Sequence, residues 1–394
     1  MNHYIGIDNS SLDHKVQVID ETGNKKSSFT IPNNLQGFAQ LHEKLQSFSN
    51  AKIGLELPHG PLVDYLHHNE YCIYALNPLK VKRYKETVKV SGNKDDIIDS
   101  IAIAEYLRHN SSQIRELLYN SPEIEKLKNL SIVRERLVRD RTRHKNKLHF
   151  VIREYFPLHE SLFSRFGDVV QLRMIIKYPT FKDLQSASDD ELRTSLKLFR
   201  YSRPTLIEKV IKKIRIHDQL IAPESEYACR IEALTLCEIL LTLRTGIQEI
   251  EKDMQNITEN HRLGKIFRSL PGAGPINSAR LLAIFGDNKE RFDNFNGAQC
   301  YFGTAPKNYK SGNYHRVSIR RACNKAGRTV LYDHAFASLR WCPWAREYYD
   351  QQRSKNKKNS VAIRALSNKW VKIIFKLWKE EIFYDESKKT SSAA

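Results

Sequence analysis

Hydrophobic and polar positions alternate through much of the first 80 residues, and this pattern predicts short strands. Segments 3–8, 14–20 and 27–32 have strand-like spacing, and a turn at Gly23 separates the last two, which predicts a three-strand antiparallel meander. The rest of this region is predicted as helices at 35–48 and 61–69 and strands at 52–57 and 72–78. The chain therefore begins with a mixed α/β domain.

From about residue 94 to about residue 260 the hydrophobic spacing is helical. Apolar residues in segment 129–156 recur near a seven-residue spacing that basic residues interrupt: Leu130, Leu137, Leu148 and Val151, with Arg134, Arg141 and His144 between them. A second long amphipathic helix is predicted at 228–257, and Ser188 and Glu191 have the spacing of a capping box. We expect a helical arm with coiled-coil character.

The fold class expected is an α/β domain followed by an all-α remainder. The expected divisions are an α/β domain, a helical coiled-coil arm, a mainly helical C-terminal domain and a disordered tail, at 1–115, 116–260, 261–383 and 384–394. The C-terminal domain contains "SLPGAGPINSARLLAIFGD", a Pro-Gly-x-Gly turn between helical segments that is typical of a helix-hairpin-helix. Its Gly272 and Gly274 would let backbone N–H groups approach a phosphate, although a tight turn without a ligand has the same pattern.

Composition indicates a polyanionic partner. The chain has 394 residues, 41% of them hydrophobic, and its 64 Lys and Arg against 45 Asp and Glu give a formal net charge of +19. Such an excess favours nucleic acid or an anionic membrane surface. No apolar run reaches the roughly 18 to 20 residues of a spanning helix, and no secretory signal is evident, so we expect a cytoplasmic protein without a membrane partner. The six cysteines lack zinc-ligand spacing and are expected to be reduced thiols.

Four acidic residues stand out against this basic background. Asp8 lies near the end of the first predicted strand, and Glu56 lies at the end of the predicted strand 52–57. Asp96 and Asp99 begin a helix three residues apart, so their side chains project from one face. Four converging carboxylates would repel one another unless divalent cations neutralised them, and hard oxygen ligands suit Mg²⁺ or Mn²⁺. Two such ions would clamp the attacking and leaving oxygens of a phosphodiester displacement.

Each acid also has a structural interpretation. Acids in the first turn of a helix complement its dipole, and an Asp after a strand often closes a turn. Two neighbouring acids are expected to lie outside the set: Asp95 points away from Asp99 on a helix, and Asp13 is expected in the loop after the first strand. As an ordered set, the strand Asp, strand Glu and helical Asp-x-x-Asp match the ribonuclease-H-like core of Holliday-junction resolvases.

The C-terminal domain also contains a segment rich in basic and aromatic residues. No acid lies between Lys307 and Arg328, and the candidate phosphate-binding residues in this segment are Lys307, Lys310, Arg316, Arg320 and Arg321. Gly312 permits a tight turn that would expose the hydroxyl of Ser311 as a nucleophile requires, although a plain turn serine explains the same pattern. Ser318 is a second candidate, in a strand-like or helical setting, and His315 is a candidate base.

A second basic surface is predicted on the arm. Its candidate phosphate-contacting residues are Arg134, Arg136, Arg139, Arg141, Arg143, Lys145 and Lys147. A solvated helix face is the alternative interpretation of this cluster. The basic amphipathic segment 352–379 has the composition of a membrane-surface helix, but packing of Trp370, Ile374 and Leu377 inside the last domain is the favoured interpretation.

Taken together, these motifs resemble the DEDD-type transposases of bacterial insertion sequences, a group that includes Piv-type DNA invertases and bridge-RNA-guided recombinases. The resemblance is carried by the four acids and by "NPLKV", "KDDIIDS", "LPGAGP", "YFGTAPKNYKSG" and "NKAG", and it extends from residue 4 to about residue 380. It implies an N-terminal RuvC-like domain, a coiled-coil arm and a C-terminal transposase domain. It also implies a metal-binding tetrad with Ser311 as the nucleophile: Asp8, Glu56, Asp96 and Asp99. Relatives often have Thr or Asn where Asp95 stands, and Asp96 is chosen because it keeps the x-x-Asp spacing.

The expected function is therefore a transposase or site-specific recombinase acting on double-stranded donor and target DNA in the bacterial nucleoid. Ser311 would form a transient phosphoserine link and release a 3′-hydroxyl for strand exchange. Because the tetrad and Ser311 are far apart in sequence, separate domains, from different protomers of a dimer or tetramer, would build the site. The resemblance also implies a noncoding guide RNA. Two alternatives stay open: a RuvC-like Holliday-junction nuclease using metal-activated water, and a binding protein without chemistry.

Overall fold

The computed structural model describes residues 1–58, 60–88, 96–217, 223–312 and 314–387, with the backbone alone at 87–88, 96–98, 223–225 and 310. These residues form two compact units, 1–119 and 120–394. The division into three domains and a tail that was expected from the sequence stays a prediction.

The first unit contains a mixed five-stranded sheet in the order β3-β2-β1-β4-β5. Its strands are β1 (His3–Asn9), β2 (Asp13–Ile19), β3 (Lys25–Pro32), β4 (Ala51–Leu55) and β5 (Cys72–Ala75). β2 pairs antiparallel with β1 and β3, which confirms the predicted meander, whereas β4 pairs parallel with β1 and β5. The topology is consistent with a ribonuclease-H-like sheet.

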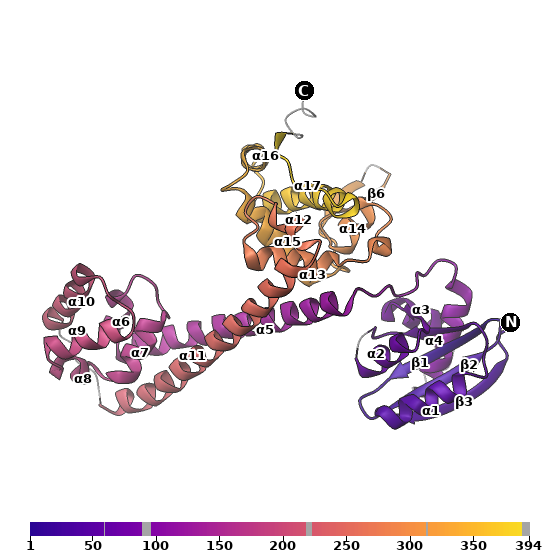
Figure 1. The fold of residues 1–394 in the computed structure, drawn as a ribbon, viewed down its shortest axis with the longest axis horizontal. Helices are drawn as coiled ribbons and strands as arrows, with labels where there is room; N and C mark the ends of the chain where they lie inside the picture. Colours follow the sequence, from indigo (N-terminus) through magenta and orange to yellow (C-terminus); the bar gives the residue numbers. More distant parts are fainter. Residues whose placement is uncertain (59, 89–95, 218–222, 313, 388–394) are drawn as a thin grey trace. The chain divides into compact units, whose positions relative to one another are not determined.

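Helices cover both faces of this sheet (Figure 1). They are α1 (Leu35–Leu45), α2 (Pro61–His68), α3 (Pro78–Val88) and α4 (Asp96–Asn110). Successive strand residues point to opposite faces of the sheet. Ile5 and Ile7 of β1 therefore share one face, where they pack with α1 and α2. Tyr4 points to the other face, where it packs with α4. Gly6 and Asp8 of β1 point to the same face as Tyr4 and therefore also face α4.

The second unit is built on two long helices that lie side by side, α5 (Pro122–Tyr155) and α11 (Pro223–Asn260) (Figure 1). Ser121 caps α5, its hydroxyl accepting from the Ile124 N–H. One end of the pair packs into a helical core with α6 (Leu158–Leu162), α7 (Val169–Lys177), α8 (Phe181–Ser186), α9 (Asp189–Leu198) and α10 (Pro204–Ile216). The Ser188–Glu191 capping box predicted from spacing is present. We call the paired helices α5 and α11 the arm, and their coiled-coil character stays a prediction.

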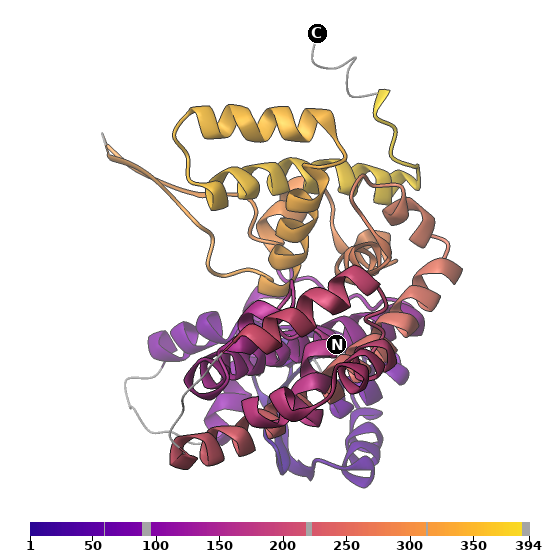
Figure 2. The ribbon, with the colours of Figure 1, turned by 90° about the vertical axis from the view of Figure 1, so that its left-hand side faces the viewer.

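The other end of the helix pair packs into the C-terminal core, which is mostly helical. Its elements are α12 (Gly264–Arg268), α13 (Pro275–Phe285), the 3₁₀ turn η1 (Lys289–Arg291), α14 (Phe295–Tyr301), α15 (Lys325–Ser338), α16 (Pro343–Ser354) and α17 (Asn359–Glu380). Two strands, β6 (Lys307–Ser311) and β7 (Tyr314–Ser318), form an antiparallel hairpin that projects from the helices (Figure 2). Trp370, Ile374 and Leu377 of α17 are buried in the core, so the predicted packing of this basic helix is confirmed.

None of the helices in the described part of the chain is both long and apolar enough to span a membrane. At the C-terminus, Tyr384 still belongs to the folded unit, because its backbone N–H donates to the Ser269 hydroxyl and its own hydroxyl accepts from the Trp344 indole, at 2.9 and 2.8 Å. Residues 388–394 of the predicted tail lie outside the described residues.

Candidate active site and nucleic-acid-binding surfaces

The parallel pair β1 and β4 brings Asp8 and Glu56 to one edge of the sheet. Ile7 pairs with Leu55, so Asp8 in β1 and Glu56, directly after β4, occupy equivalent positions at the carboxyl ends of adjacent strands. Strands in a sheet lie about 4.8 Å apart, which places these two carboxylates within reach of one cation.

A glycine lets α4 approach this edge closely. A Cβ added at Gly6 would lie 2.5 Å from the Ala104 nitrogen and 3.1 Å from its Cα, and nearer still to the Ser100 carbonyl oxygen. Gly6 lies two residues before Asp8 in β1, so both face α4. Because only glycine fits this gap, the sequence of β1 sets how near Asp99, at the start of α4, comes to Asp8.

Three of the four predicted acids act on one another electrostatically. Burial raises the pKa of Glu56, and the negative charges of Asp8 and Asp99 raise it further, while Lys85 acts in the opposite direction. The Lys85 ammonium donates a hydrogen bond to Asp99. A nearby cation stabilises the charged form of a carboxylate whose pKa is raised by neighbouring negative charges. Lys85 supplies one positive charge at this point.

The fourth acid is only partly described. Asp96 begins α4, as predicted, but its side chain lies outside the described residues, as does Asp95 altogether. Among the side chains that are described, no three His, Cys, Asp or Glu residues form a ready metal cluster. The donor set nevertheless fits a hard divalent cation, because it offers carboxylate oxygens and the charges of Asp8 and Asp99 raise the pKa of Glu56.

The prediction for Asp13 was wrong in position. Asp13 is the first residue of β2 rather than part of a loop, because the connection after β1 is a tight turn in which the Ser10 hydroxyl accepts from the Leu12 and Asp13 N–H groups. The Asp13 carboxylate pairs with Lys15 at 3.3 Å. It is thus engaged along its own strand, as expected for an acid outside the set.

Ser311 lies exposed at the end of β6, directly before Gly312, whose φ of +53° is the left-handed conformation that glycine adopts without strain. The hairpin register pairs Ser311 with Tyr314, Tyr309 with Arg316 and Lys307 with Ser318. Because paired residues share a face and faces alternate along a strand, these six side chains lie on one face. We call this set the serine face.

The charges around Ser311 follow from the same register. His315 pairs with Lys310 and so lies on the opposite face, which argues against His315 as the base for Ser311. The side chain of Lys310 lies outside the described residues. On the serine face, the Lys307 ammonium lies 4.5 Å from the centroid of the Tyr309 ring and is the main cause of the lowered pKa of Tyr309.

After the hairpin, Arg320 is half-buried and Arg321 is exposed. The Nε atom of Arg320 is buried and has no hydrogen-bond partner among the residues that the structure describes. Both side chains follow β7, so the basic segment continues beyond the hairpin toward α15.

A tight turn lies between α12 and α13, where the sequence predicts a helix-hairpin-helix. Gly272 has a φ of +77°, and a Cβ there would lie 2.8 Å from the backbone carbonyl of Ala337 in α15. Gly272 therefore has a packing role, and its phosphate contact stays a prediction. Gly274 is exposed at the start of α13, with nothing within 4 Å of its would-be Cβ, so this position leaves room for a ligand.

The seven predicted phosphate-contacting residues of the arm fall into two groups. Three form ion pairs: Arg134 with Glu251 at 2.6 Å, Lys147 with Glu232 at 2.6 Å and Arg143 with Asp140 at 3.1 Å. The first two pairs join α5 to α11. For the other four the structure describes no carboxylate partner: Arg136, Arg139, Arg141 and Lys145. The arm thus uses part of its basic residues for its own stability.

Sequence reasoning missed two parts of the acidic site. Gly6 interrupts an otherwise apolar strand, and an isolated glycine in a strand often marks a close backbone approach, so this signal was available. Lys85 gave no such signal, because only the packing of α3 beside α4 brings it to Asp99.

Comparison with known proteins covers both units. Residues 5–157 match a transposase family described as DEDD transposases of the IS110 type, and residues 264–350 match the transposase IS116/IS110/IS902 family. Together these matches cover more than half of the chain.

Several curated proteins are similar over most of their length. The mini-circle putative transposase for IS117 of Streptomyces coelicolor is 27% identical over 93% of this chain and 92% of its own length. The insertion element IS110 uncharacterized 43.6 kDa protein of the same organism is 22% identical, over 97% and 95%. The insertion element IS900 uncharacterized 42 kDa protein of Mycobacterium paratuberculosis is 23% identical, over 76% and 75%. The family matches in both units show that the chain belongs to the IS110/IS116 family of DEDD transposases, enzymes that cleave and transfer DNA strands.

Proposed function

We propose that this transposase cuts and rejoins DNA through a covalent link to Ser311, with a RuvC-like domain that holds Mg²⁺ or Mn²⁺ on four carboxylates: Asp8, Glu56, Asp96 and Asp99. The observation that carries the metal-binding part is the raised pKa of Glu56, since burial and the charges of Asp8 and Asp99 produce it. A divalent cation bound there would offset the repulsion between these carboxylates.

The exposed position of Ser311 supports its role as the nucleophile. The hydroxyl stands at the tip of a projecting hairpin, on the face that also presents Lys307 and Arg316. A phosphodiester that lies along this face would meet positive charge on both strands of the hairpin, which favours the pentavalent transition state.

The reaction is a pair of exchanges at phosphorus. The Ser311 oxygen bonds to the phosphorus and the bond to the 3′-oxygen breaks, so the serine proton is lost and the departing 3′-oxygen takes one up. A 3′-hydroxyl from a second strand then attacks the phosphoserine and releases Ser311, which conserves the number of phosphodiester bonds. Bound divalent ions would polarise the phosphate and lower the pKa of the attacking hydroxyl.

The partners in this proposal are donor and target duplex DNA, a noncoding guide RNA and further copies of the chain. The net charge of +19 supports polyanionic partners, and the guide RNA rests on the resemblance to bridge-RNA-guided recombinases. Sequencing the nucleic acid that co-purifies with the protein tests this part. Recovery of a single structured RNA supports the guide, and recovery of only random cellular RNA contradicts it.

A trapped covalent adduct tests the nucleophile. A nicked DNA substrate that loses its 3′-hydroxyl fragment after cleavage should leave DNA attached to the wild-type protein in the presence of Mg²⁺ and co-purified RNA. The adduct should disappear in Ser311→Ala and persist in Ser318→Ala, a matched control on the same face of the hairpin. Cleavage that survives Ser311→Ala without an adduct but is abolished by Asp8→Asn would instead identify a nuclease that uses metal-activated water.

A further inference from the structure

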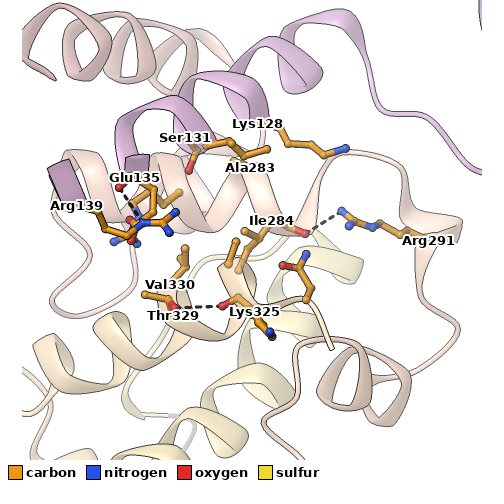
Figure 3. Close-up of a pocket in the computed structure, with 14 residues that line it drawn as sticks. Lys128, Ser131, Glu135, Arg139, Ala283, Ile284, Arg291, Lys325, Thr329 and Val330 are labelled. Atoms are coloured by element: carbon orange, nitrogen blue, oxygen red, sulfur yellow. Dashed lines mark hydrogen bonds and ion pairs between the residues drawn. The ribbon is translucent and has the colours of Figure 1, made fainter. Parts of the chain in front are cut away.

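A cavity of about 330 Å³ opens in the second unit where the arm helix α5 meets α13 and α15 (Figure 3). Apolar residues form part of its lining, and we call four of them the floor: Ile132, Ala283, Ile284 and Val330. Ala283, Ile284 and Val330 are almost fully buried, whereas Ile132 is 38% exposed, so the floor is open to solvent on the side of α5. This volume is at the low end of small-ligand sites, roughly 300–1,000 Å³, and suits one small planar group rather than a duplex.

Positive charge surrounds the opening. Five cationic side chains and one carboxylate line the cavity: Lys128, Arg139, Arg280, Arg291 and Lys325, with Glu135. Arg280 is shared by two carboxylates, since it donates to Glu135 at 3.3 Å and to Asp333 at 2.8 Å, and Lys128 pairs with Glu125 at 3.1 Å. For Arg139, Arg291 and Lys325, no carboxylate partner occurs among the described residues. The mouth of the cavity is therefore suited to an anion.

Part of this cationic rim is held in place by hydrogen bonds. Arg291 donates to the carbonyls of Ile284 and Phe285 at 2.8 and 3.2 Å, and to the Tyr301 hydroxyl at 3.1 Å. Asn324 also donates to this hydroxyl, at 3.2 Å, while its own side-chain oxygen accepts from the Gly327 N–H and caps α15. This network fixes a guanidinium beside the first turn of α15.

The other cations reach the opening from separate elements. Figure 3 shows Arg139 and Lys128 extending from α5, and Lys325 extending from the first turn of α15 on the opposite side of the cavity. The N-terminal end of a helix adds partial positive charge at that side.

We propose that this cavity binds one nucleotide of a single-stranded or locally opened nucleic acid, with the base on the apolar floor and the phosphate between Arg139 and Lys325. An apolar floor inside a ring of cations matches a nucleotide, which joins a planar, largely apolar base to an anionic phosphate. A free phosphate leaves the floor uncovered. The cavity lies between the arm and the C-terminal core, so a nucleotide there is held by both parts of the unit.

This inference goes beyond the proposed chemistry and uses neither the tetrad nor Ser311. Binding is measured with the full-length protein in EDTA, so that strand cleavage cannot contribute. Failure of the covalent adduct would leave this binding intact, and failure of this binding would leave the adduct test intact, so the two proposals fail separately.

The test uses fluorescently labelled 12-nucleotide single strands of DNA and of RNA, and a DNA strand of equal length that lacks bases. Lys325→Glu is expected to weaken binding about tenfold and to reduce the salt dependence by about one phosphate contact. Lys209→Glu, with the same charge change at another exposed lysine, on α10, is the control and is expected to bind within about twofold of wild type.

Thr329→Trp tests whether the cavity binds the base, because this variant leaves the charge of the cavity unchanged. Thr329 is exposed at the cavity wall, and an indole there would occupy the space over the floor without changing the charge. It is expected to weaken binding of both base-containing strands about tenfold and to leave the abasic strand unaffected. The DNA and RNA arms show which nucleic acid supplies the nucleotide. The proposal is overturned if Lys325→Glu binds no worse than Lys209→Glu, or if Thr329→Trp binds base-containing strands like wild type. Thermal melts followed by tryptophan fluorescence verify that each variant is folded.

Discussion

Replacing Gly6 by alanine should displace α4 from the sheet and disturb the acidic site without touching any acid. An alanine Cβ would lie 2.5 Å from the Ala104 nitrogen, whereas ordinary contacts begin near 3.4 Å, so α4 must move by about 1 Å. The obstacle is helix backbone, which cannot rotate away as a side chain can. Overpacking of this kind costs about 2 kcal/mol.

The matched control is Gly54→Ala. Gly54 is the direct partner of Gly6 in the parallel pair, but its would-be Cβ meets only side-chain atoms of Leu76, Ile103 and Leu107, at 3.0 to 3.3 Å. These can adjust by a few tenths of an ångström. We expect Gly54→Ala to cost less than about 1 kcal/mol.

Hydrogen exchange followed by mass spectrometry is the appropriate assay, because it reports on α4 separately from the second unit. All four tryptophans lie beyond residue 119, so tryptophan fluorescence does not report on the sheet. A loss of about 2 kcal/mol corresponds to roughly 30-fold faster exchange in the most protected α4 amides. A displacement of about 1 Å is also expected to lower Mg²⁺-dependent cleavage by about 100-fold. If α4 exchanges in Gly6→Ala as it does in Gly54→Ala, the close approach does not position Asp99, and the reasoning is wrong.

Three further predictions concern charged groups. The pKa of Glu56 is raised in the folded state, so its ionisation opposes folding above its unfolded pKa of about 4.3. Without divalent metal, Glu56→Gln should therefore slow hydrogen exchange in α4 at pH 7 but not at pH 4. Added Mg²⁺ should slow this exchange in wild type alone. Arg280→Met should lower the stability of the second unit by about 1 kcal/mol in tryptophan-monitored melts, because it leaves the half-exposed Asp333 without its partner, and the added change Asp333→Asn should recover part of the loss. Burial lowers the pKa of both His159 and His334 to about 3, so the second unit should lose stability as pH falls from about 6.5 toward 3, and His334→Phe should reduce this dependence in the same melts while leaving the part due to His159.

The local elements were predictable where the sequence pattern reports directly on burial. The meander follows from alternation in β1 to β3, and the Ser188–Glu191 capping box follows from spacing. The error at Asp13 arose because the turn after β1 is shorter than its polar sequence suggests: Ser10 supplies the hydrogen bonds that a longer loop would have taken from water.

Long-range uses of charge were not predictable. Composition marks Arg134 and Lys147 as phosphate-binding residues, yet both pair with acids about 85 to 120 positions later in the chain, on α11. Helical periodicity shows that α5 and α11 each have an apolar face, but it does not specify which acid meets which base across the pair. The same limit hid Lys85, whose partner Asp99 belongs to the next helix.

Two structural features determine the acidic site, the pairing of β1 with β4 and the close approach of α4 to Gly6, and the sequence predicts the first more directly than the second. Asp8 and Glu56 could be placed together from the sequence, because a parallel strand pair brings its carboxyl ends to one edge whatever the intervening residues are. The distance from these two acids to Asp99 depends instead on the absence of a side chain at Gly6, since any side chain at that position would hold α4 away from the sheet. A transposase of this family that carries all four acids but a larger residue at the position of Gly6 should consequently require a compensating small residue or bend in the helix that corresponds to α4, and a structure of such a protein without either change would contradict this account.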